Sequence, residues 1–233
     1  MARREADEEI GLPRDNEKLR GFSVEYLCEL PANLAKTELG VRPCVAFLGP
    51  TSKSPTSSSP ADADNNSIEE KLIPRLDPKE VAAVFTAPFH NFLRREWEGE
   101  APPPVQKDGR PEQWYRGSWV DWHETRWRMH NFYMPRPPPS PSLLRSPSNS
   151  TSPSTWEPDA LDSLTTFRIW GMTARILVEA ARVAYEEEPE FEHNSHFGDE
   201  EMIGKLLRMG RLSEVEKKGE VLTKEVLREA SKM

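Results

Sequence analysis

Three glutamates near the start of the chain have the spacing of a metal-binding helix face. Glu5, Glu8 and Glu9 lie three and four positions apart, so in a helix their carboxylates share one face. Like charges at this spacing destabilise a helix by about 0.2–0.5 kcal/mol per pair, and a bound divalent cation reverses that sign. Mg²⁺ is held by one or two carboxylates together with waters and substrate phosphates. Taken alone, such a cluster favours a solvated acidic helix face, and a divalent-cation site is the alternative.

The residues around these glutamates predict how the helix is held and where it ends. Arg4 precedes Glu8 by four positions, and its guanidinium is placed to fix the orientation of one carboxylate of this face. Gly11 follows the acidic stretch and permits a sharp exit from the helix.

The segment from Arg4 to Leu12 resembles the second half of the Nudix box, which ends Arg-Glu-apolar-x-Glu-Glu-x-Gly-apolar. Further segments are similar to one branch of that superfamily, the coenzyme A diphosphatases. They are Leu30-Pro31, 41–48, 80–85 with Pro88, and 167–177. The resemblance is scattered over residues 3 to about 184.

This resemblance implies a metal-dependent hydrolase that splits the pyrophosphate bond of coenzyme A or its thioesters. The products would be 3′,5′-ADP and phosphopantetheine or its acyl form, with Mg²⁺ or Mn²⁺ as cofactor. Glu5 and Glu9 match the metal ligands of the family. Glu8 matches a position that serves as a further ligand or, in some members, as the catalytic base. The base is not assigned, and Glu80 is an unsupported candidate for it.

The resemblance also implies a mixed sheet between helices that is incomplete at its N-terminal end. A full Nudix box begins with a Gly and an earlier Glu, and the family's coenzyme A signature lies further upstream, so both would precede Met1. The chain as given is therefore expected to hydrolyse coenzyme A weakly or not at all. The alternative is a catalytically impaired, Nudix-like fragment that acts as a binding or interaction protein.

Charge and composition exclude several other classes of protein. With 31 Lys and Arg against 39 Asp and Glu, the net charge is −8, which disfavours nucleic acid and anionic membranes as partners. No uninterrupted apolar run of about 18 residues predicts a membrane span. Cys28 and Cys44 are the two cysteines, and neither has zinc-ligand spacing.

Apolar patterns predict strands interleaved with helices, an α/β or α+β fold. Strands are expected at 41–48, 81–87 and 126–134, and an amphipathic helix at about 168–186. A capping box formed by Ser213 and Glu216 predicts the start of a last helix.

The predicted organisation is a partial Nudix domain at 1–186 followed by a helical tail at 187–233. Stretches rich in Pro and Ser interrupt the domain and are predicted to be disordered inserts, because they cannot bury enough apolar surface to offset the entropy of ordering. They lie at about 50–67, 100–112 and 136–158.

The aromatic and histidine clusters are interpreted as structural features and not as ligand sites. Four tryptophans could stack on an adenine, but core packing is the favoured interpretation for a cluster that flanks a strand. They are Trp114, Trp119, Trp122 and Trp127. His193 and His196 have no partner with zinc spacing and are interpreted as solvated loop residues.

The chain ends Ser231-Lys232-Met233, a variant of the Ser-Lys-Leu signal for peroxisomes. This tripeptide predicts a peroxisomal import receptor as partner and a peroxisomal location. The alternatives are an ordinary charged helix end and a cytoplasmic location.

Overall fold

The computed structural model describes part of the chain, which is divided into two compact units. The described residues are 2–19, 22–35, 39–50, 77, 81, 85–99, 113–122, 125–135, 166–212 and 223–233. Unit 1 is formed by residues 1–30 and 42–84, and unit 2 by residues 31–41 and 85–233. The domain boundary at residue 186 stays a prediction.

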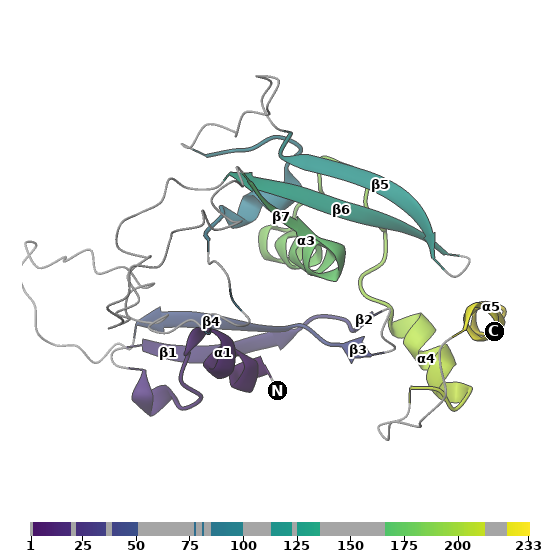
Figure 1. Cartoon of the computed structure of the whole chain (residues 1–233), viewed down its shortest axis with the longest axis horizontal. Helices are drawn as coiled ribbons and strands as arrows, with labels where there is room; N and C mark the ends of the chain where they lie inside the picture. The colour runs from purple at the N-terminus through teal and green to yellow at the C-terminus, as the bar shows by residue number, and fades with distance from the viewer. Residues whose placement is uncertain are drawn as a thin grey trace, which may run out of the picture. The chain divides into compact units, whose positions relative to one another are not determined.

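Unit 1 contains the acidic helix and a β-hairpin-like pair. α1 (Ala2–Ile10) is followed by the short 3₁₀ helix η1 (Asn16–Lys18). Strands β1 (Phe22–Glu29) and β4 (Cys44–Pro50) pair antiparallel, with an irregularity in register between Tyr26 and Cys28 (Figure 1). Because α1 contains Glu5, Glu8 and Glu9, the helix predicted around these glutamates is confirmed.

Gly11 ends α1 as the sequence predicts. Its φ of +71° lies in the left-handed region that glycine adopts at little cost, and its N–H donates to the carbonyl of Asp7 at 3.2 Å. The side chain of Arg3 donates to the carbonyls of Pro13 and Arg14, which holds the chain that follows against the start of the same helix.

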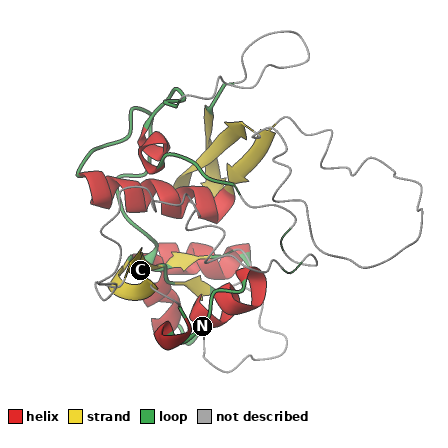
Figure 2. Ribbon diagram, turned by 90° about the vertical axis from the view of Figure 1, so that its left-hand side faces the viewer, coloured by secondary structure: helices red, strands yellow, loops and turns green. Residues whose placement is uncertain are grey.

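Unit 2 is built on a three-stranded antiparallel sheet covered by a helix. β5 (Tyr115–Trp122), β6 (Thr125–Pro135) and β7 (Thr166–Trp170) pair in that order, and α3 (Gly171–Tyr185) lies along one face (Figures 1 and 2). The 3₁₀ helix η2 (Phe89–Leu93) packs against α3. Two residues each form the small pair of β2 (Asn33–Leu34) and β3 (Gly40–Val41).

In the main core of unit 2, aromatic side chains on the sheet side pack against small side chains from the helix α3. Phe132 is fully buried between Phe92, Trp114 and the α3 alanines Ala174 and Ala181. Alanines at these positions let the helix backbone approach the sheet closely, while the rings fill the space between them. The indole N–H of Trp114 donates to the carbonyl of Asn91 at 3.0 Å, so the core interpretation of this tryptophan is confirmed.

A second cluster joins the last two helices. α4 (Glu200–Arg208) and α5 (Lys224–Ser231) bury Leu206, Leu227 and Ala230 together with Leu34 of β2. Thr223 caps α5, because its hydroxyl accepts from the N–H of Val226. The predicted cap at Ser213 and Glu216 lies outside the described residues, and the observed helix begins later, at Lys224.

Two of the predicted strands are found and one is wrong in its described part. β4 matches the strand predicted at 41–48, and β6 contains the one predicted at 126–134. Residues Phe85–Ala87 of the strand predicted at 81–87 are irregular. The Phe85 ring stacks on Phe167 at 4.9 Å, so this apolar segment is held by side-chain packing. Earlier in the segment, the N–H of Val81 donates to the carbonyl of Asp77, the spacing of a helical turn.

The predicted helix at 168–186 begins at Gly171, because residues 168–170 complete β7. Gly171 has a φ of +64°, which turns the chain sharply from strand to helix. The mixed α/β class is confirmed by these helices and sheets, and all strands paired among the described residues are antiparallel. Pro50, the first residue of the insert predicted at about 50–67, ends β4. The rest of that insert and the inserts predicted at 100–112 and 136–158 lie outside the described residues.

Within the described part of the chain, every helix falls short of the length and apolar character that crossing a membrane requires.

Candidate functional site

The acidic face of α1 carries Glu5, Glu8 and Glu9, and two of these carboxylates are paired with arginines. Arg4 contacts Glu5 at 2.5 Å, and Arg14 contacts Glu8 at 3.2 Å. Arg4 therefore fixes one carboxylate of this face, that of Glu5, and not the one four positions along the helix. Because the chain folds back after Gly11, Arg14 comes close to the helix and takes the place next to Glu8. Among the described residues, Glu9 makes no ion pair and is half-buried.

The donor chemistry of this face fits a hard divalent cation, although the side chains as placed are not assembled around one. Carboxylate oxygens are the ligands that Mg²⁺ and Mn²⁺ prefer, and one or two from the protein suffice when substrate phosphates complete the shell. In the described part of the chain, no three His, Cys, Asp or Glu side chains are grouped closely enough to hold a metal ion. The roles of Glu5, Glu8 and Glu9 as ligands, and of Glu8 in catalysis, stay predictions.

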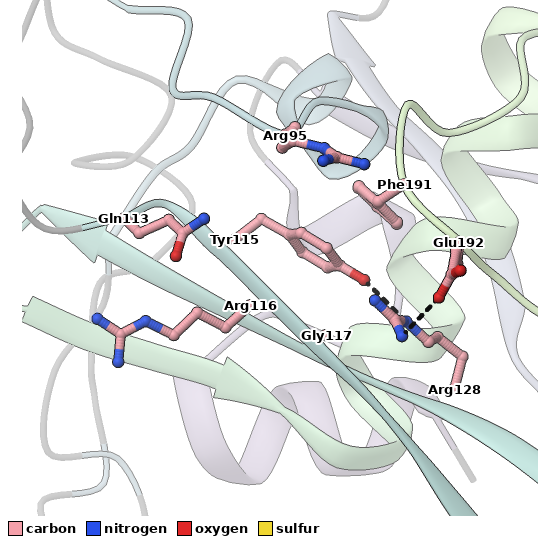
Figure 3. Close-up of a pocket in the computed structure, with 8 residues that line it drawn as sticks. All are labelled: Arg95, Gln113, Tyr115, Arg116, Gly117, Arg128, Phe191 and Glu192. Atoms are coloured by element: carbon pink, nitrogen blue, oxygen red, sulfur yellow. Dashed lines mark hydrogen bonds and ion pairs between the residues drawn. The ribbon is translucent and has the colours of Figure 1, made fainter.

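A polar cavity of about 510 Å³ lies in unit 2, on the face of the β5–β6 hairpin that meets Phe191 and Glu192 (Figure 3). Tyr115, Gly117 and Arg128 form its floor, and Arg95 lies at its edge. Strand alternation explains the floor: Tyr115 and Gly117 point to one face of β5, and Arg128 lies on the neighbouring strand near them.

A chain of hydrogen bonds fixes the floor of this polar cavity. Arg128 donates through Nη1 to Glu192 at 3.0 Å and through Nε to the Tyr115 hydroxyl at 3.4 Å. That hydroxyl lies 3.1 Å from Nδ1 of His130, which is buried beneath it. Burial, with Arg128 adding to it, lowers the pKa of His130 to about 3, so the ring is neutral and Nδ1 can accept the hydroxyl proton.

At Gly117 the guanidinium of Arg128 and the hydroxyl of Tyr115 occupy the space of a side chain, so any larger residue would displace one of them. A Cβ there would lie 2.1 Å from the Tyr115 hydroxyl and 2.4 Å from Nη2 of Arg128. Burial raises the pKa of Tyr115, which keeps its hydroxyl protonated, although Arg128 opposes the shift.

Arg95 is the cation best placed for an anionic ligand in the polar cavity. One of its guanidinium nitrogens donates to the carbonyl of Glu190 at 3.2 Å, and in the described structure the group pairs with no carboxylate. Arg116 lines the cavity but extends away from Tyr115 in Figure 3, and its guanidinium lies 5.0 Å from the Tyr133 ring. A planar guanidinium with unused donors suits phosphate oxygens.

The remaining residues singled out from the sequence are dispersed. His193 pairs with Glu188 at 2.7 Å and is structural, and His196 is exposed. Trp119 donates to Glu192 at 2.7 Å, and Trp127 lies against Arg175. The side chain of Trp122 and all of Glu80 lie outside the described residues.

The C-terminal tripeptide continues from α5. Ser231 ends the helix and donates to the carbonyl of Arg228, and Met233 is 62% exposed. The last residue is thus accessible on the surface of unit 2.

Together these residues define a mixed α/β protein with an acidic helix in one unit and a polar, arginine-bearing cavity in the other. No protein-family model matches the chain. The chain is similar to peroxisomal coenzyme A diphosphatase 1 of Saccharomyces cerevisiae, with 29% identity over 196 residues. The alignment covers 79% of this chain and 54% of the yeast protein, so the chain spans about half the length of that curated relative.

Proposed function

We propose that this protein hydrolyses the pyrophosphate bond of coenzyme A or its acyl thioesters, releasing 3′,5′-ADP and phosphopantetheine or its acyl form. The observation that carries the proposal is the similarity to the yeast coenzyme A diphosphatase over 79% of the chain. The Nudix-like spacing of Glu5, Glu8 and Glu9 on α1 also supports it, because it supplies the carboxylates that such chemistry needs.

In this proposal Glu5 and Glu9 hold Mg²⁺ or Mn²⁺, and Glu8 is a further ligand or the residue that accepts a proton. Bound metal would neutralise charge on the phosphate oxygens and acidify the attacking water. Glu9 is the readiest of the three, since it has no ion pair in the described structure. Glu5 and Glu8 would first exchange their contacts with Arg4 and Arg14, which are half-exposed pairs of low energy.

The polar cavity of unit 2 is proposed as a place for a phosphate group of the substrate. Arg95 supplies unused guanidinium donors, and the Tyr115 hydroxyl is kept protonated by burial. Arg128 is already neutralised by Glu192, so it orients the floor and contributes less to binding an anion.

A second candidate is a binding protein of the same ancestry with impaired catalysis. It is favoured by the pairing of Glu5 and Glu8 with arginines, which leaves the acidic face of α1 without three assembled carboxylates. Such a protein would bind coenzyme A without consuming it.

We further propose a peroxisomal location, with Ser231, Lys232 and Met233 read by an import receptor. The support is the similarity to a peroxisomal coenzyme A diphosphatase of yeast and the exposure of Met233. A fluorescent fusion at the N-terminus should be punctate, and deletion of Met233 should make it diffuse. A diffuse signal from both would remove the proposal.

The proposed activity is tested by incubating the full chain with coenzyme A and Mg²⁺ or Mn²⁺, and separating products by chromatography. Slow, metal-dependent release of 3′,5′-ADP is expected. Coenzyme A that binds by calorimetry but is recovered intact would favour the binding protein instead.

A further inference from the structure

A second, mainly apolar cavity of about 630 Å³ lies in unit 2. Arg128 is the one residue that lines both this cavity and the polar cavity described above. The apolar cavity is bounded by β2, by β5 and β6, and by the turn from β7 into α3. Its apolar lining residues are Leu34, Val120, Trp127, Met129, Trp170 and Met172. Its volume is within the range of about 300–1,000 Å³ found for small-molecule sites.

The two arginines in the wall of this apolar cavity, Arg175 and Arg128, are neutralised by the protein itself. Arg175 contacts Glu179 at 2.9 Å and Asp199 at 3.1 Å, and all three side chains are buried. Its guanidinium carbon lies over the Trp127 ring, 3.9 Å from the centroid. Arg128 is likewise paired with Glu192. The cavity is therefore unsuited to phosphate and suited to a neutral, largely apolar group.

One buried polar atom in the wall lacks a partner. Asn33 is 1% exposed, and its Nδ2 donates to the carbonyl of Pro31 at 3.2 Å, but its Oδ1 accepts no hydrogen bond. Exchanging the two amide atoms would place two acceptors against each other, so the orientation is fixed by Pro31. A buried acceptor without a donor is costly, and Asn33 borders the cavity, so a bound N–H or O–H group that reached Oδ1 would remove this cost.

We infer that the apolar cavity binds the amide-containing arm and acyl chain of an acyl thioester, with an amide N–H donating to Oδ1 of Asn33. The inference rests on the proposed function for the identity of the thioester. An acyl chain matches the methionine and tryptophan walls, because these polarisable and planar side chains pack well against flexible methylene groups. The secondary amides of a pantetheine arm supply the missing donor.

The test uses two probes without any phosphate, so that hydrolysis and metal binding play no part. S-octanoyl-pantetheine carries both the acyl chain and amides, and the octanoyl thioester of ethanethiol carries the acyl chain with no N–H or O–H donor. Calorimetry on the full chain should show both probes binding, with the amide probe about tenfold tighter. Asn33→Leu should abolish this preference while retaining the binding of the amide-free probe, a ratio that general destabilisation would not change.

Two substitutions that reduce the space in the cavity complete the test. Met172→Trp on α3 and Val120→Trp on β5 should each weaken both probes at least tenfold. Val183→Trp is the matched control, because Val183 lies on the same helix as Met172 but is 52% exposed outside the cavity. Circular dichroism verifies folding of each variant.

The outcomes separate this inference from the proposed hydrolase activity. No binding of either probe, or equal binding in the parent, Met172→Trp and Val120→Trp, would overturn the acyl site even if coenzyme A is hydrolysed. A retained preference for the amide probe in Asn33→Leu would overturn the role of Oδ1. Probe binding without any release of 3′,5′-ADP from coenzyme A would keep the cavity as a thioester-binding site and remove the hydrolase.

Discussion

The guanidinium carbon of Arg175 lies 3.9 Å from the centroid of the Trp127 ring, and the same guanidinium contacts two buried carboxylates, those of Glu179 and Asp199. Asp199 in turn accepts from the N–H of Leu34 at 2.8 Å. Arg175 therefore joins the sheet, α3, β2 and the start of α4 through one planar group.

Replacing Arg175 by Met should destabilise unit 2 strongly. The change leaves Glu179 and Asp199 buried without their cation, which costs about 3–5 kcal/mol in the free energy of unfolding. Urea unfolding of parent and variant measures the difference. Arg168→Met on β7 is the control, since Arg168 is exposed, and its loss should cost less than about 1 kcal/mol. An equal loss of unfolding free energy in the two variants would show that the buried ion pairs of Arg175 contribute no more to stability than an exposed arginine does.

Gly198→Ala should destabilise the protein more than the same change at Gly210. Both glycines have positive φ, +57° and +75°, so alanine is strained at each by about 1–2 kcal/mol. At Gly198 a Cβ would also lie 2.6 Å from Cβ of Pro31 and 2.7 Å from the carbonyl oxygen of Ala32, whereas at Gly210 nothing lies within 4 Å. Thermal unfolding should show a larger fall in Tm for Gly198→Ala. A similar fall for both would contradict the close approach of residues 31–32.

Acid should destabilise the fold through His130. Its pKa is about 3 in the folded protein against 6.5 ordinarily, chiefly because of burial, so between these values the unfolded chain binds more protons than the folded one. The free energy of unfolding therefore falls as pH falls through 6.5, by about 2 kcal/mol between about pH 7 and about pH 5. Urea unfolding of parent and His130→Asn at both pH values isolates this contribution. Identical pH dependence in the two proteins would refute it.

Arg95→Gln should weaken substrate binding with little effect on the bond-breaking step. The guanidinium at the edge of the polar cavity is expected to contact a phosphate, so KM for coenzyme A should rise about tenfold while kcat changes little. Arg126→Gln is the control, because Arg126 is exposed over Trp119 and outside this cavity. An unchanged KM in Arg95→Gln would exclude the cavity from substrate binding.

The sequence predicts those elements whose periodicity follows from one buried face. β6 alternates between buried residues such as Phe132 and Met134 and their less buried neighbours, and α3 buries Ala174, Val178 and Ala181 at helical spacing. The strand predicted at 81–87 is wrong at its described residues 85–87, because periodicity in a short run does not separate a strand from a segment held by ring stacking, as Phe85 is on Phe167.

The sequence predicts a candidate site when its residues are close together in the chain, and misses one whose residues are brought together by folding. Glu5, Glu8 and Glu9 are neighbours along one helix, so their spacing alone places them together. The partner of Glu8 is missed, because Arg14 reaches it only after the turn at Gly11. The polar cavity is missed as well, since Arg128 and Glu192 are 64 positions apart and meet through folding alone.

The most direct test of the account is the rate of 3′,5′-ADP release from coenzyme A by the parent, Glu9→Gln and Glu17→Gln with Mg²⁺ or Mn²⁺. Glu9 lies on the acidic face of α1 and is the proposed ligand without an ion pair in the described structure, while Glu17 is an exposed glutamate of η1 in the same unit. The account predicts slow release by the parent and by Glu17→Gln, and a rate at least tenfold lower in Glu9→Gln. Equal release by all three proteins, or none by the parent, would contradict it.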